Sequence, residues 1–134
     1  MAFLNQETGA LTFSDGLHLS AGLAVGELAQ RLQGRQDAIV RMDSHAVAGG
    51  RLIPVCTVMG GALQSVTLSI SSVASRPMRK AERQRAFLFA RLEVRDPCQD
   101  TMASVHIECP FGELFISTDP VTGRSEARIL YAAH

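Results

Sequence analysis

Few residues of the chain combine a reactive side chain with a useful spacing. His106 and Cys109 lie close together in the sequence, and a thiol beside an imidazole is the pattern of an activated nucleophile. We therefore consider a pocket between a helix and a sheet that would contain Arg85, His106 and Cys109. The competing interpretation is structural, because a free Cys next to Pro110 in an apolar context usually behaves as a small buried hydrophobe.

Two other polar groups have residue types that occur in catalytic sites. Asp43, Ser44 and His45 are consecutive. Neighbouring residues of an extended chain point to opposite faces, so we expect a polar loop here and no relay among the three side chains. Asp15 belongs to an Asp-Gly turn, and turn chemistry explains it without a functional role.

The sequence lacks the common catalytic and cofactor-binding motifs. It contains no phosphate-binding loop, no dinucleotide fingerprint, no Ser-hydrolase elbow, no zinc-protease helix and no calcium loop. The His residues show no metal-ligand spacing, and the Cys residues include no C-x-x-C pair. We accordingly expect no catalytic residue, no cofactor and no metal site, and a function other than that of an enzyme.

A basic cluster occupies the start of the predicted long helix. It comprises Arg76, Arg79, Lys80 and Arg83. Positive charge at a helix N-terminus opposes the helix dipole, so these residues suggest a surface that binds an acidic partner. A solvated helix face is the simpler alternative.

Length and composition limit the classes of protein. The chain has 134 residues, the size of one domain, which we assign to residues 1–134. Its formal net charge is zero, and it has no Trp and one Tyr, so we expect no nucleic-acid partner. The three Cys residues argue against a disulfide framework and for a reducing compartment. Because there is no signal peptide and no apolar run of about 18 residues, we expect a cytoplasmic protein without a membrane partner.

The C-terminal part predicts three strands. Apolar and polar residues alternate over residues 103–108, 113–117 and 124–131. A period of two residues places the two sets on opposite faces of a sheet. Residues 109–112 interrupt the first pair of strands with Pro and Gly. Residues 118–123 form the clearest turn of the chain: Pro120 suits its first corner, Asp119 can bond the backbone ahead of it, and Gly123 can take a positive φ.

The N-terminal half predicts a hairpin around Asp15-Gly16, a helix over about residues 23–33 and a short strand over residues 38–40. Residues 52–59 are apolar on both faces and predict a central strand. Pro54 within it predicts a bulge or an edge position, because Pro donates no ladder bond. Gly60-Gly61 predicts a two-residue turn into a second strand over residues 62–71.

The main helix is expected to begin after Ser75 and to run from about Pro77 to Glu93. Its apolar face would comprise Met78, Ala81, Leu88, Phe89 and Leu92. The elements together predict an α+β fold: a mainly antiparallel sheet of five to seven strands with two helices, the longer packed on one face.

The order of motifs loosely resembles a group of small uncharacterised bacterial α+β proteins. The residues that carry the resemblance are Glu82 and Arg85 on a helix, Phe111-Gly112 between strands, and Asp119 and Gly123 in the last turn. Some proteins of this group are carried in mobile gene cassettes or are considered toxin-immunity proteins. The resemblance implies a protein-binding role and brings no family active site.

We therefore predict a non-enzymatic protein-binding module, of the immunity or adaptor kind, that binds another protein or a second copy of itself. One alternative is a protein similar to type III secretion chaperones, which share the order of a helix, a hairpin, a long helix and further strands. The other alternative is a domain that binds a small ligand in the pocket between helix and sheet.

Overall fold

The computed structural model describes residues 2–73, 80–94, 99–100 and 104–132. Its helices are α1 (Gly26–Leu32) and α2 (Lys80–Leu92). The strands are β1 (Leu11–Thr12), β2 (His18–Leu19), β3 (Gly22–Leu23), β4 (Ala38–Arg41), β5 (His45–Val47), β6 (Gly50–Met59), β7 (Ala62–Val73), β8 (Gln99–Asp100), β9 (Ser104–Cys109), β10 (Gly112–Thr118) and β11 (Ser125–Tyr131). The antiparallel strands with two helices confirm the predicted α+β class.

Nine of the described strands form one antiparallel sheet. The main order is β4-β6-β7-β11-β10-β9-β8, with β3 added to β7 and β5 added to β6. Strands β1 and β2 pair separately. The predicted count of five to seven strands is too low, because β3, β5 and β8 have two or three residues each and carry no periodic pattern.

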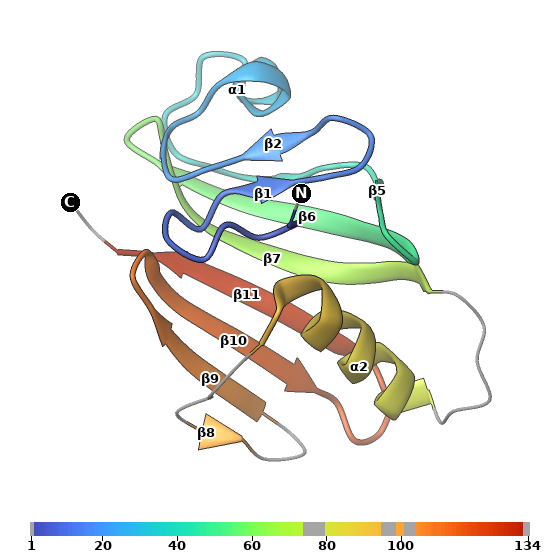
Figure 1. Cartoon of the computed structure of the whole chain (residues 1–134). Coiled ribbons are helices and arrows are strands. Elements are labelled where there is room, and N and C mark those ends of the chain that lie inside the picture. The colour runs from blue at the N-terminus through green and yellow to red at the C-terminus, as the bar shows by residue number, and fades with distance from the viewer. Residues whose placement is uncertain (1, 74–79, 95–98, 101–103, 133–134) are drawn as a thin grey trace.

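One face of the sheet, which we call the inner face, forms the core. In Figure 1, α2 lies across the lower strands, and the β1–β2 hairpin and α1 lie over the upper ones. Buried inner-face side chains include Leu52, Cys56, Val66, Leu68, Leu114, Ile116 and Ile129. The covering elements contribute Leu4, Leu11, Phe13, Leu28, Leu88 and Leu92 to the same cluster. Each such side chain stabilises the fold by about 1.5–3 kcal/mol when fully buried.

The opposite face, the outer face, carries a mixed surface. A single cross-strand row runs through Val55, Thr67, Arg128, Phe115 and His106 on five adjacent strands. Arg128 is exposed and the other four are partly exposed. The alternation predicted for β9, β10 and β11 therefore has the expected faces, with Ala127, Ile129 and Tyr131 buried.

Turn residues fix the registers as predicted. Gly60 and Gly61 both have positive φ, and Met59 pairs with Ala62 across them. In the last turn, the Asp119 side chain accepts hydrogen bonds from the backbone N–H groups of Val121 and Thr122. The backbone N–H of Gly123 donates to the Asp119 carbonyl.

Strand β6 explains how Pro54 is tolerated within a central strand. The Pro54 carbonyl accepts from the Met42 N–H at 2.9 Å, so the bonding edge of Pro54 faces the segment between β4 and β5. The pairing of β6 with β5 ends before Pro54 and its pairing with β4 begins after it, so the missing N–H of Pro54 removes no hydrogen bond from a strand ladder. The predicted bulge is absent at Pro54; the register shifts lie at Arg51/Leu52 and Thr57/Val58.

The first helix is shorter than predicted. Leu23 pairs with Ala62, and Val25 has an extended backbone and a side chain that is 62% exposed. Because residues 22–23 are held in the sheet, the helix begins only at Gly26. The apolar stripe of α1 consists of Leu28 and Leu32, both buried as expected.

The second helix packs against β7, β10 and β11 on the inner face, as predicted. Residues 74–79, including the expected start at Pro77 and the core residue Met78, lie outside the described residues. Leu88 and Leu92 are fully buried, and Phe89 is partly exposed. Neither described helix is long and apolar enough to cross a membrane.

Gly112 offers a direct test of the hairpin between β9 and β10. It has φ of +145°, and a Cβ atom there would lie against the Leu130 carbonyl and the Ala132 nitrogen. We expect Gly112→Ala to lower the free energy of unfolding by more than about 2 kcal/mol, measured by urea denaturation. Gly16, at φ of +102° with open space around it, is the matched control. Gly16→Ala should cost about 1 kcal/mol; equal losses at both sites would contradict the close approach at Gly112.

Candidate functional site

The structure separates the residues of the predicted pocket. His106 projects from the outer face of β9, stacks on Phe115 at a centroid distance of 4.5 Å and bonds Glu113 at 3.2 Å. Cys109 lies an odd number of residues further along the same strand and faces the other side. A Cys–His nucleophile pair is therefore not assembled, because strand geometry holds the two side chains on opposite faces.

Cys109 and Arg85 also lie in different surroundings. Cys109 borders a cavity of about 170 Å³ together with Gln6, Leu92, Val94 and Leu114. The Arg85 guanidinium lies over the Phe89 ring at 4.3 Å from its centroid. Neither Arg85 nor His106 lines that cavity, so the three predicted residues do not share one pocket.

Only one member of the predicted basic cluster has a described side chain. Arg76 and Arg79 lie outside the described residues, and Lys80 begins α2. Arg83 is partly exposed, and its Nε is shielded from solvent without a hydrogen bond to a described residue. The binding role of this cluster therefore stays a prediction.

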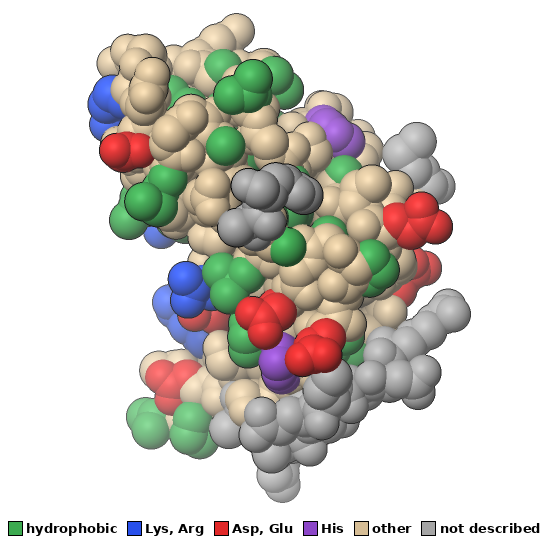
Figure 2. Space-filling model, turned by 90° about the vertical axis from the view of Figure 1, so that its left-hand side faces the viewer, with side chains coloured by type: hydrophobic (Ala, Val, Ile, Leu, Met, Phe, Trp, Pro, Cys, Tyr) green, Lys and Arg blue, Asp and Glu red, His purple; other side chains and the backbone are tan. Residues whose placement is uncertain are grey.

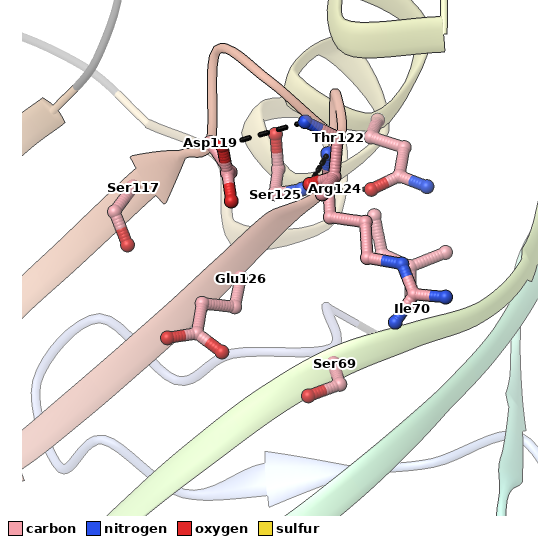
Figure 3. A pocket seen from close by; sticks show the side chains of 9 residues that line it. Ser69, Ile70, Ser117, Asp119, Thr122, Arg124, Ser125 and Glu126 are labelled. Carbon is pink, nitrogen blue, oxygen red and sulfur yellow. Dashed lines mark hydrogen bonds between the residues drawn. The ribbon is translucent and has the colours of Figure 1, made fainter.

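A large hollow opens where β7 and β11 separate, and we call it the notch. Its volume is about 640 Å³. The ladder between the two strands ends at the pair Ser69 and Glu126, whereas β7 continues to Val73 in contact with β6. The notch is lined by Ser69, Ile70, Gln84, Ser117, Asp119, Thr122, Arg124, Ser125 and Glu126. Figure 3 shows these side chains on β7, on the end of β10 and around the β10–β11 turn.

Gln84 of α2 occupies the position of a ladder acceptor where the two strands separate. Continued pairing would bring Ser125 opposite Ile70 and direct the Ser125 N–H to the Ile70 carbonyl. The Ser125 N–H instead donates to Oε1 of Gln84 at 2.7 Å. The side-chain amide thus replaces a ladder acceptor at the point where the pairing ends.

Arg124 and Glu126 are charged side chains of the notch that have no ion-pair partner among the described residues. The Arg124 side chain extends past Ile70 toward Ser69, while Glu126 projects elsewhere (Figure 3). Within the described residues, the Arg124 guanidinium forms no ion pair and no hydrogen bond. Asp119 is occupied by the turn, and those backbone bonds hold the pKa of its carboxyl below its usual value. Among the described residues, the notch therefore offers one planar cation without a partner, together with hydroxyl groups and the Glu126 carboxylate.

A second polar cluster joins residues that are far apart in the sequence. His45 Nδ1 lies 3.0 Å from Oδ2 of Asp15, which also accepts the Ala46 N–H at 2.9 Å. The other ring nitrogen, Nε2, is buried without a hydrogen bond and lies 3.8 Å from Glu27. Since Nε2 is shielded from solvent, the cluster ties the β1–β2 hairpin and α1 to β5 and does not present a base to a substrate.

The predicted absence of a relay among Asp43, Ser44 and His45 agrees with this geometry. Asp43 bonds Arg31 at 2.8 Å, and Ser44 accepts from Arg51 at 3.0 Å. Each of the three side chains thus has a different partner. Asp15 does more than form its turn, which the prediction missed because the contact with His45 spans 30 positions. Among the described residues, no group of three or more His, Cys, Asp or Glu side chains could hold a metal ion.

The role of Gln84 can be tested by keeping or removing its acceptor. Gln84→Ala leaves the Ser125 N–H without its partner, so we expect a loss of about 1 kcal/mol in the free energy of unfolding and faster amide exchange at Ser125. Gln84→Glu retains an acceptor oxygen and is the matched control. Exchange at Ser125 that stays unchanged in Gln84→Ala would contradict the bond.

Asp15 predicts a defined pH dependence of stability. Partial burial would raise its pKa, but bonds from the Ala46 N–H and from His45 outweigh burial and leave the pKa below the usual 3.8. The ionised carboxylate thus stabilises the fold above pH 3.8, and this contribution is lost as pH falls through the lower folded pKa. We expect Asp15→Asn to be less stable than the wild type at pH 6, with the difference shrinking below about pH 4 in urea titrations. A difference in stability between the two proteins that does not change with pH would contradict a lowered pKa at Asp15. The contribution of Asp119 is the same in both proteins and cancels in the comparison.

Comparison with known protein families, with curated proteins and with solved structures finds no match to the chain. The resemblance to cassette-borne and immunity proteins therefore stays a prediction. The functional argument rests on the geometry of the notch and of the sheet.

Proposed function

We propose that the protein is a non-enzymatic protein-binding module, of the immunity or adaptor kind, which receives an extended acidic segment of another protein in the notch. The observation that carries this proposal is the Arg124 guanidinium, which has no partner in the described part of the chain and lies beside the open end of the β7–β11 ladder. A guanidinium presents donors in a fixed fork that matches a carboxylate.

The surroundings of Arg124 suit a polypeptide. The notch lies between two strands that diverge. It is therefore elongated along the strand direction, which suits a bound peptide in an extended conformation. Hydroxyl groups of Ser69, Ser117 and Thr122 can each donate or accept a hydrogen bond with a partner's backbone. Arg83 adjoins Gln84 on α2, which adds to the basic character predicted for this helix. These features support an acidic partner segment.

A small polar ligand is the second candidate. The notch volume of about 640 Å³ lies within the range of small-molecule sites, about 300–1,000 Å³. This pocket differs from the one that the sequence predicted, because Arg85, His106 and Cys109 do not line it. We also propose a cytoplasmic location, which the buried free thiol of Cys56 supports. Burial raises the pKa of Cys56 to about 12, so this thiol stays protonated and inert.

The test is a selection from random linear peptides displayed on phage. The wild-type protein should enrich peptides rich in Asp and Glu, and their affinity should fall at least about tenfold in Arg124→Glu, since removal of a charge-assisted bond costs about 1.5–3 kcal/mol. Fluorescence anisotropy with the synthetic peptides measures the change.

Arg128→Glu is the matched control, because Arg128 lies on β11 four residues after Arg124, is exposed and does not line the notch. This variant should keep the affinity of the wild type. Peptides without acidic residues, or equal losses in both variants, would overturn the proposal. A failure of the selection together with binding of a free dicarboxylate at Arg124 would favour the small-ligand candidate.

A further inference from the structure

Among the described strands, β4 stands at the end of the strand order and pairs with β6 alone, so its other edge has no strand partner there. Natural sheets usually blunt such an edge with Lys, Pro or a covering element, because unpaired peptide groups can pair with another chain. The centre of β4 instead carries Ile39, whose side chain is 73% exposed.

The hydrogen-bond pattern shows which peptide groups face outward. The Met42 N–H bonds the Pro54 carbonyl, in register with the pairs Val40–Cys56 and Ala38–Val58. Bonding alternates along an antiparallel strand, so the peptide groups of Ile39 and Arg41 point away from β6. Within the described residues, no hydrogen bond reaches these outward groups.

The sequence of this edge is complementary to itself. Asp37 and Arg41 lie two residues before and two residues after Ile39, with Asp37 just ahead of the strand. If β4 pairs antiparallel with β4 of a second copy, with Ile39 opposite Ile39, then Asp37 of each copy lies opposite Arg41 of the other. The same register uses the outward peptide groups of Ile39 and Arg41. Opposite charges that face each other across strands stabilise the pair.

One exposed apolar side chain lies close to β4. Met59, at the end of the neighbouring strand β6, is 58% exposed, whereas the exposed Leu23 lies on β3, on the far side of β7. In Figure 2, hydrophobic, acidic and basic side chains lie next to one another on the upper left of the surface. The side chains of Asp37, Ile39 and Arg41 suit a second copy of the chain, which would bring the same apolar and charged groups to the contact.

We infer that two copies of the protein associate through their β4 strands, with Ile39 on the two-fold axis and two Asp37–Arg41 contacts, so that the two sheets become continuous. The contact is isologous, because each copy contributes the same edge. This surface lies on the strand at the end of the sheet and does not include any residue of the notch.

The test is analytical ultracentrifugation of the purified chain over a range of concentrations. The wild type should form a dimer whose fraction rises with concentration. Asp37→Lys and Arg41→Glu each place like charges opposite each other twice, so each should weaken the dimer at least about tenfold. Arg128→Glu makes the same change of charge elsewhere on the exposed surface and should dimerise like the wild type.

The two weakened variants provide the decisive experiment when they are mixed. In a heterodimer of Asp37→Lys with Arg41→Glu, both contacts again join opposite charges, so the mixture should regain dimers that neither variant forms alone. The double variant D37K/R41E should also recover. Asp37 accepts the Gly60 N–H at 2.8 Å, so circular dichroism must first show that each variant is folded.

Ile39→Pro is an independent variant, because it removes the central outward N–H while an edge position tolerates Pro. It should abolish the dimer without unfolding the chain. A wild type that stays monomeric at the highest concentration would overturn the inference, and so would mixed variants that fail to associate. Both results are independent of peptide capture at Arg124, since no peptide is added.

Discussion

The burial of one face of the antiparallel sheet is the constraint on which the rest of the structure depends. The long hairpin of β6 and β7 carries fully buried residues such as Leu52, Cys56 and Leu68. Because a sheet face of this size cannot remain in water, the N-terminal hairpin, α1 and α2 all pack on the same side. The outer face and the strand at the end of the sheet are then left to contact solvent or other molecules.

Two contacts between distant parts of the chain hold the covering layer in place. The Tyr131 hydroxyl at the end of β11 donates to the Gly9 carbonyl at 2.8 Å, and burial raises the pKa of this phenol. Gln84 joins α2 to the start of β11. The second contact lies at the notch, because the same amide that joins the helix to β11 accepts the first N–H beyond the β7–β11 ladder.

Local patterns in the sequence were sufficient to predict many of the strands and turns of the sheet. The alternation in residues 124–131 and the turn chemistry of Asp119 and Gly60-Gly61 depend on residues within a few positions, and the structure confirms them. Long-range contacts were not predictable. Nothing local indicates that Asp15 meets His45, and a helix starting at Leu23 failed because pairing with β7 outweighs helix propensity there.

The candidate sites show the same contrast between what local sequence patterns predict and what only long-range contacts bring together. His106 and Cys109 are adjacent enough in the sequence to suggest a pair, yet the period of the strand places them on opposite faces. The notch consists of residues from β7, α2, β10 and β11, so only the three-dimensional pairing brings them together. A sequence signal did exist for the edge strand, since Asp37, Ile39 and Arg41 alternate with apolar residues, but its meaning depends on β4 lying at the end of the sheet.

The most direct measurement of the central claim is an NMR titration of the ¹⁵N-labelled protein with an acidic peptide obtained by selection. If the notch receives the peptide, the largest shifts should appear at the Arg124 side-chain Nε–H and at the backbone amides of Ile70, Ser117 and Ser125. Shifts concentrated in β4 or around His106 and Phe115, with Arg124 unchanged, would contradict the account.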